Sequence, residues 1–264
     1  MRPIAPSLAL ALTFSLASVS SAPSAAQAPA SSASVLVPES VFDGEQLHAG
    51  WSVVVRGERI VAVGPSASIA APPGARTVSL AGLTLLPGLI EGHSHLLLHP
   101  YNEATWNDQV LKDGVAYRVA RAVTHAERTV MAGVTTVRDL GSEGAGYADV
   151  GLRRAIADGV IVGPRMLVAG PAMVATGSYG PKGFAPEWRV PQGAEEADGL
   201  EGVTRVARDQ IGHGVDVIKI YADYRWGPNG ESRPTFTLDE ITRIVEVARS
   251  SGRPVVAHSG TAEG

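Results

Sequence analysis

The chain has 264 residues, of which 45% are hydrophobic, so it is long enough for one large globular domain or two modest ones. Its formal net charge of −4 gives no reason to expect a nucleic acid or an anionic membrane as a partner. The chain contains no cysteine, which excludes disulfides and thiolate metal sites. Any bound metal must therefore be held by histidine, carboxylate or a modified side chain.

The N-terminal residues have the pattern of a secretory signal peptide. Arg2 supplies a weak positive start, and the apolar stretch from Leu8 to Leu16 is too short to span a membrane. Ala26-Gln27-Ala28 fits a small-x-small cleavage site, with Ser20-Ser21-Ala22 as a competing one. We therefore predict a signal peptide over residues 1–28, cleavage near Ala28, and a secreted or periplasmic mature protein without a membrane span. The alternative is a disordered low-complexity tail.

Residues 34–86 are expected to form a small β module. Two apolar runs at 51–55 and 60–63 flank the turn Arg56-Gly57-Glu58-Arg59, which is typical of a hairpin. A loop containing two prolines and a glycine follows at 71–74. Beyond it, residues 77–80 and 83–86 extend the β pattern.

After Pro87-Gly88, short apolar strands alternate with helical stretches. The five strand-like runs are 89–93, 135–139, 165–169, 217–221 and 254–258. Helices are predicted between them, for example at Tyr117–Met131 and Leu238–Ser250, the second with a capping box formed by Thr237 and Glu240. This alternation predicts parallel βαβ units, an α/β fold. We interpret residues 87–264 as an incomplete (β/α)8 TIM barrel with about five of its eight strands.

Three strand ends carry side chains that bind metals. His93 and His95 end the first strand two residues apart, so both imidazoles can reach one cation. Lys219 lies inside an apolar strand, where its charge is costly unless it is paired or removed by carboxylation with CO2. His258 ends another strand at the same depth. Each residue alone also has a purely structural explanation, as a surface histidine, a snorkelling lysine or a strand-end histidine.

Two more strand-end features have weaker signals. Tyr221 follows Lys219 by two residues and is a candidate to hydrogen-bond a substrate carbonyl or carboxylate, with strand-end packing as the alternative. Arg138-Asp139 ends the second strand, and we expect a structural role for this pair.

The run from Pro87 to His95, PGLIEGHSH, resembles the signature of the amidohydrolase superfamily. The resemblance continues through 132–139, 163–165, the Lys219 strand and 256–258, and is similar to the imidazolonepropionase and Xaa-Pro dipeptidase-like branch. It departs at residue 91, where Glu91 replaces the usual aspartate. It departs again at 175–180, where many relatives carry a histidine.

The resemblance implies a binuclear centre. His93 and His95 would bind the more buried metal, carboxylated Lys219 would bridge both metals, and His258 would bind the second. Zinc is the first expectation, with cobalt or manganese as alternatives. Residues 34–86 would be part of the β-sandwich that flanks the barrel in this family.

The implied activity is hydrolysis of C–N amide bonds in dipeptides or small cyclic amides by metal-activated water. Lactones, organophosphates and cyclic imides are alternative substrates, and a non-catalytic truncated product is a third reading. The eighth-strand aspartate expected to carry the proton is not in this chain. We therefore assign no catalytic residue within it and expect the chain alone to be inactive. A small molecule or dipeptide is the expected partner, and a homo-oligomer is left open.

Overall fold

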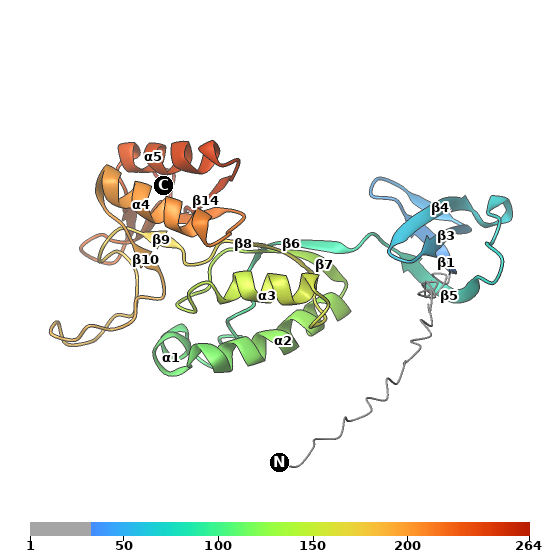
Figure 1. The fold of residues 1–264 in the computed structure, drawn as a ribbon, viewed down its shortest axis with the longest axis horizontal. Coiled ribbons are helices and arrows are strands. Elements are labelled where there is room, and N and C mark those ends of the chain that lie inside the picture. The colour runs from blue at the N-terminus through green and yellow to red at the C-terminus, as the bar shows by residue number, and fades with distance from the viewer. Residues whose placement is uncertain (1–32) are drawn as a thin grey trace, which may run out of the picture. The chain divides into compact units, whose positions relative to one another are not determined.

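The computed structural model describes residues 33–264, so the predicted signal peptide lies outside the described residues. The chain divides into two compact units, the first ending at Pro87 and the second running from Gly88 to Gly264 (Figure 1). Among the described residues, no helix is long and apolar enough to cross a membrane.

The first unit is a five-stranded sheet in which the central strand β1 pairs antiparallel with β2 and β3 and parallel with β5. Its strands are β1 (Ala33–Phe42), β2 (Leu47–Ala49), β3 (Trp51–Arg56), β4 (Arg59–Pro65) and β5 (Arg76–Leu85), with a short 3-10 helix at Ser66–Ser68. The predicted hairpin is confirmed, because Gly57 turns between β3 and β4 with φ of 58°. The two β-type runs predicted after residue 76 form one strand, β5.

The second unit contains two parallel sheets. One has the order β6-β7-β8 and the other β10-β9-β11-β14. Their strands are β6 (Leu89–Ser94), β7 (Val134–Asp139), β8 (Arg165–Val168), β9 (Met173–Val174), β10 (Glu195–Glu196), β11 (Ile218–Tyr221) and β14 (Val255–His258). The backbone carbonyl of Val168 accepts the N–H of Asp216 at 2.8 Å, and this bond joins the two sheets. All five predicted barrel strands are therefore confirmed, together with their parallel direction.

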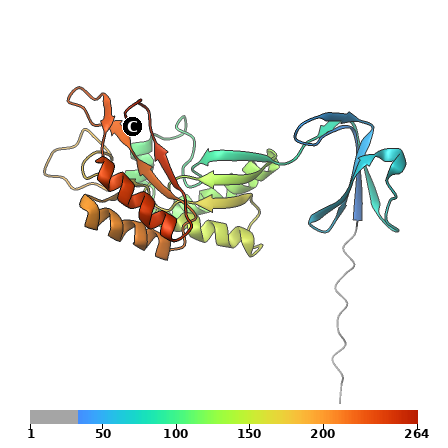
Figure 2. The ribbon, with the colours of Figure 1, turned by 90° about the horizontal axis from the view of Figure 1, so that it is seen from above.

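Five helices accompany these strands: α1 (Trp106–Lys112), α2 (Val115–Met131), α3 (Ala148–Ala157), α4 (Gly199–Gly212) and α5 (Leu238–Ser250). A small hairpin, β12 (Asp223–Arg225) and β13 (Ser232–Pro234), leaves the end of β11. Figure 2 shows α4 (orange) and α5 (red) lying side by side along one face of the second sheet. Ile218 and Ile220 of β11 pack there against Val206 and Ile244.

Local sequence signals explain where the helices begin and end. Thr237 and Glu240 form the predicted capping box at the start of α5. Gly133 and Gly252 follow α2 and α5 with φ of 95° and 72°, conformations that favour glycine. The strands are parallel within each sheet, so their carboxyl ends lie at the same edge of that sheet.

Candidate metal centre

The second unit gathers polar side chains at the carboxyl ends of its strands. His93 lies at the end of β6, and His95 follows directly after it. Lys219 and Tyr221 share one face of β11, because side chains two residues apart on a strand point the same way. The parallel register places Tyr221 opposite His258 of β14. Candidate ligands from three strands thus occupy equivalent strand-end positions.

Distances and electrostatics bring these groups into one neighbourhood. The ring centroids of His93 and His95 are 5.1 Å apart. The Tyr221 ring has the Lys219 Nζ atom 5.4 Å from its centroid and stacks on His258 at 4.8 Å. Burial lowers the pKa of His93, and the positive charges of Lys219, His95 and His258 lower it further. The other three candidate ligands therefore lie close enough to His93 for their charges to change its pKa, although they come from both sheets.

Lys219 is the least ordinary member of this group. The residue is only 1% exposed, and none of the ion pairs formed within residues 33–264 includes it. Burial lowers the pKa of Lys219, and the Glu143 carboxylate opposes that shift. A buried lysine without an ion pair carries an uncompensated charge, which carboxylation would remove.

A carboxylated Lys219 would add an anionic oxygen to the nitrogen donors of the histidines. Across the described part of the chain, no group of three or more histidine, aspartate or glutamate side chains is placed to hold a metal ion. The candidate donor set therefore consists of the three histidines together with Lys219. Imidazole nitrogen and carbamate oxygen together suit zinc-type divalent ions.

Hydrogen bonds fix the ring of one candidate ligand and the backbone that follows another. The His95 Nδ1 atom lies 2.9 Å from the Gly141 carbonyl oxygen, so it donates there and leaves Nε2 with its lone pair for a metal. The Asp223 carboxylate accepts the backbone N–H groups of Gly260 at 2.9 Å and Thr261 at 2.7 Å. This second set of bonds secures the turn immediately after His258.

A buried arginine, which sequence reasoning missed, ties together the loops after β6 and β7. Arg118 of α2 is 2% exposed, and its guanidinium donates to three backbone carbonyls. They belong to Leu97 at 3.0 Å, Ser142 at 2.8 Å and Glu143 at 2.8 Å. The sequence did carry a signal, because Arg118 shares its helix face with Ala122 and Ala126, which are both fully buried.

The expected structural role of Arg138-Asp139 agrees with their contacts. Buried Asp139 accepts the Leu96 N–H at 2.7 Å, directly beside His95, and burial raises the pKa of Asp139 well above its usual range. Arg138 donates from Nε to the Gly92 carbonyl at 2.8 Å, directly beside His93. Each residue thus fixes the backbone next to one candidate ligand.

Tyr221 belongs to an aromatic cluster that sequence reasoning also missed. Tyr179 lies 4.6 Å from Tyr221, 5.0 Å from Tyr224 and 5.2 Å from Trp106, measured between ring centroids. Burial, followed by the charge of Glu143, raises the pKa of both Tyr179 and Tyr221. Both hydroxyls therefore keep their protons near neutral pH.

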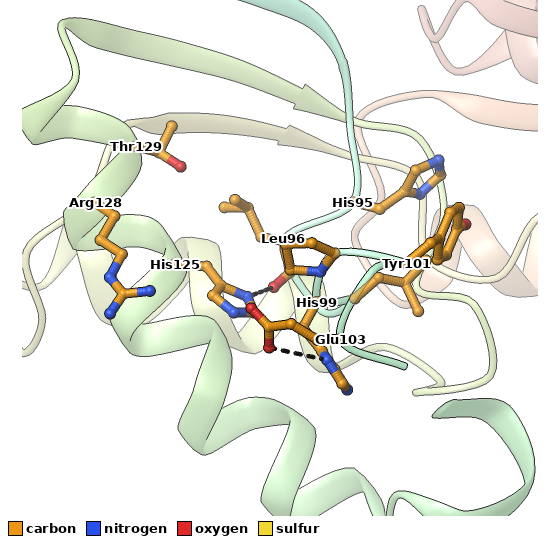
Figure 3. Close-up of a pocket in the computed structure, with 10 residues that line it drawn as sticks. His95, Leu96, His99, Tyr101, Glu103, His125, Arg128 and Thr129 are labelled. Carbon is orange, nitrogen blue, oxygen red and sulfur yellow. Dashed lines mark hydrogen bonds and ion pairs between the residues drawn. The ribbon is translucent and has the colours of Figure 1, made fainter. Parts of the chain in front are cut away.

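A cavity of about 440 Å³ adjoins the site on the side of α2 (Figure 3). It is lined by His95, Leu96, Leu98, His99, Pro100, Tyr101, Glu103, His125, Arg128 and Thr129. Two more histidines line it: His99 is buried against Asp113 at 3.1 Å, and His125 bonds the Leu96 carbonyl at 2.9 Å. His95 is thus shared between this cavity and the candidate centre.

Parallel strands with polar side chains gathered at their carboxyl ends are typical of α/β proteins, barrels among them. A model of the amidohydrolase family matches residues 84–264, and the chain belongs to that family. This result confirms both the resemblance drawn from the sequence and the predicted fold class, although the strands described here do not close a barrel.

Comparison with individual proteins agrees. The chain is 30% identical to ochratoxinase of Aspergillus niger over 246 residues, covering 86% of this chain and 49% of that protein. It is similar in structure to a Xaa-Pro dipeptidase with bound methionine, with 27% identity and a TM-score of 0.75 over 88% of this chain and 58% of the other. A prolidase complexed with N-methylphosphonate-L-proline is 29% identical, with a TM-score of 0.71 over 87% and 57%. The chain therefore spans about half the length of the relatives it matches.

Proposed function

We propose that this chain is part of a metal-dependent hydrolase of C–N amide bonds that acts on dipeptides or small cyclic amides. The observation that carries the proposal is Lys219, a buried lysine without an ion pair that lies among His93, His95 and His258 at neighbouring strand ends. The name of one similar protein supports the bond type, since a Xaa-Pro dipeptidase is named for the dipeptides that it cleaves.

In this proposal, His93 and His95 would hold the more buried ion, His258 would hold the second, and carboxylated Lys219 would contribute to both. Divalent ions held by these residues would supply hydroxide near neutral pH and would polarise a substrate carbonyl. Zinc is the expected metal, with cobalt or manganese as alternatives.

The chain's own residues orient this machinery. The Gly141 carbonyl accepts a hydrogen bond from the His95 ring, and Arg118 binds the loops after β6 and β7. The tyrosine cluster around Tyr221 forms an aromatic wall next to His258. An aromatic wall suits a substrate with a flat or compact ring, such as proline.

Lys219→Ala tests the proposal in the full-length protein. This variant should lose most of its bound metal and its dipeptide hydrolysis, because it removes the only proposed anionic ligand among the residues described. Elemental analysis gives metal content, and carbon-13 NMR after labelling with ¹³C-bicarbonate detects the carbamate directly.

Lys112→Ala is the matched control, since the Lys112 side chain is 73% exposed and pairs only with Asp108 on its own helix. Metal content and hydrolysis should match the wild type in this variant. If the Lys219→Ala variant still binds two ions per chain, Lys219 does not bridge them. If the protein hydrolyses lactones or phosphotriesters in preference to every dipeptide tested, dipeptides are not its substrates and the proposed substrate class is wrong.

We also propose export of the protein, on the basis of the Ala26-Gln27-Ala28 pattern.

A further inference from the structure

Glu143 occupies an unusual position in the loop after β7. It is the only non-glycine residue between 33 and 264 with a positive φ, at 50°, and it is 3% exposed. Arg118 holds its backbone by donating to the Glu143 and Ser142 carbonyls, each at 2.8 Å. A strained conformation that the surroundings impose in this way is typical of functional sites.

One oxygen of the Glu143 carboxylate receives two hydrogen bonds. Oε2 lies 2.8 Å from Trp106 Nε1 and 2.8 Å from the Tyr179 hydroxyl. An indole N–H can only donate, and a tyrosine hydroxyl has a single proton to give. Tyr179 therefore donates its proton to Glu143, and its oxygen remains as an acceptor.

The Tyr221 hydroxyl completes the chain. It lies 3.3 Å from the Tyr179 hydroxyl and donates to it, because the Tyr179 proton is already used. The direction is therefore from Tyr221 to Tyr179 to Glu143. A substrate that meets the Tyr221 oxygen finds lone pairs and no available proton.

We propose that Glu143 is a positioning residue which, through Tyr179, turns the Tyr221 hydroxyl proton away from the strand-end site, so that Tyr221 accepts a hydrogen bond from a substrate ammonium group. The inference rests on the proposed amide hydrolysis and deepens it, since it specifies a free α-amino group on the substrate. A carbonyl or carboxylate, the partner suggested for Tyr221 by the sequence alone, would need the proton that Tyr179 receives.

Substrate pairs test the direction of this relay in the full-length protein. Alanyl-proline and its desamino analogue propanoyl-proline differ only in the α-amino group. Tyr221→Phe should raise KM for alanyl-proline about tenfold, the effect of one hydrogen bond to a charged group, while kcat and the desamino substrate change little. Tyr179→Phe should bring the KM for alanyl-proline closer to the KM for propanoyl-proline, because it frees the Tyr221 hydroxyl proton.

Tyr147→Phe is the matched control, since the Tyr147 hydroxyl also donates to a carboxylate, that of Asp209 at 3.0 Å, outside the site. It should leave both substrates unchanged. Equal losses for both substrates in Tyr221→Phe would overturn the proposal. Additive effects of Tyr179→Phe and Tyr221→Phe in the double variant would also overturn it, because coupled residues must be non-additive.

A readout independent of activity separates this inference from the proposed function. The protein has four tryptophans, and Trp106→Phe identifies the indole N–H resonance of Trp106 in a ¹⁵N NMR spectrum. Glu143→Gln should shift that resonance, because a neutral amide replaces the carboxylate acceptor. If Glu143→Gln shifts the resonance but the wild-type protein hydrolyses no dipeptide, only the proposed function is refuted. If the wild-type protein is active but Glu143→Gln leaves the resonance unshifted, only the relay is refuted.

Discussion

Replacing Arg118 with methionine should destabilise the second unit strongly. The guanidinium satisfies three backbone carbonyls, of Leu97, Ser142 and Glu143, in a position that is 2% exposed. An orphaned buried acceptor costs about 1–3 kcal/mol, so three would cost about 3–9 kcal/mol if nothing relaxed. Methionine removes the desolvated charge and the loops admit some water, which places the expected loss in the free energy of unfolding at about 3–5 kcal/mol.

Urea unfolding of the full-length protein measures this loss, and metal content in the same preparation reports on His95, whose loop Arg118 holds. Arg154→Met is the control, because the Arg154 side chain is 83% exposed and pairs only with Asp158 along its own helix. Its cost should stay within about 0.5 kcal/mol. An Arg118→Met protein that unfolds within about 1 kcal/mol of the wild type would show that the three carbonyls find other partners, and the reasoning would fail.

Three further predictions concern the rest of the chain. Gly88→Ala should cost about 1–3 kcal/mol in unfolding free energy, because the added Cβ would lie 2.1 Å from the Thr135 Oγ1 atom, whereas Gly114→Ala, with no atom within 4 Å, should cost far less. Hydrogen bonds from its own turn lower the pKa of Asp43 to about 2, so its contribution to stability is present above pH 3.8 and is lost as the pH falls toward 2. Asp43→Asn should flatten that part of an acid-unfolding curve of the first unit, and an unchanged curve would exclude the effect. N-terminal sequencing of the exported protein should begin just after Ala28, and a retained start methionine would contradict the signal peptide.

Much of the second unit could be predicted because its strands are short apolar runs bounded by glycine, proline and polar residues. The confirmed capping box at Thr237 shows that helix starts are also encoded in a few adjacent side chains. Lys219 was visible for the same reason, since a lysine inside an apolar run contradicts its surroundings. Strands β9 and β10, of two residues each, have no periodicity to detect.

The remainder of the site depends on contacts between residues that are distant in the sequence. Glu143 meets Tyr179 and Trp106 only after the fold brings together three segments separated by more than 30 positions each. Nothing in the local sequence around Glu143 distinguishes it from a surface loop acidic residue. Arg118 was accessible in principle, because a charged residue on the buried face of an amphipathic helix must find partners.

Because Lys219 is buried, the rate at which it reacts with a reagent in solution should report how often β11 opens. Only three lysines occur in the chain, and the other two, Lys112 and Lys182, are exposed. In the metal-free protein kept free of CO2, where Lys219 is an unmodified amine, an amine-acylating reagent should therefore modify those two quickly, and a third mass increment on the lysines should appear only when the strand transiently separates from its neighbours. The rate of that slow step measures local opening at the centre of the site without a substrate.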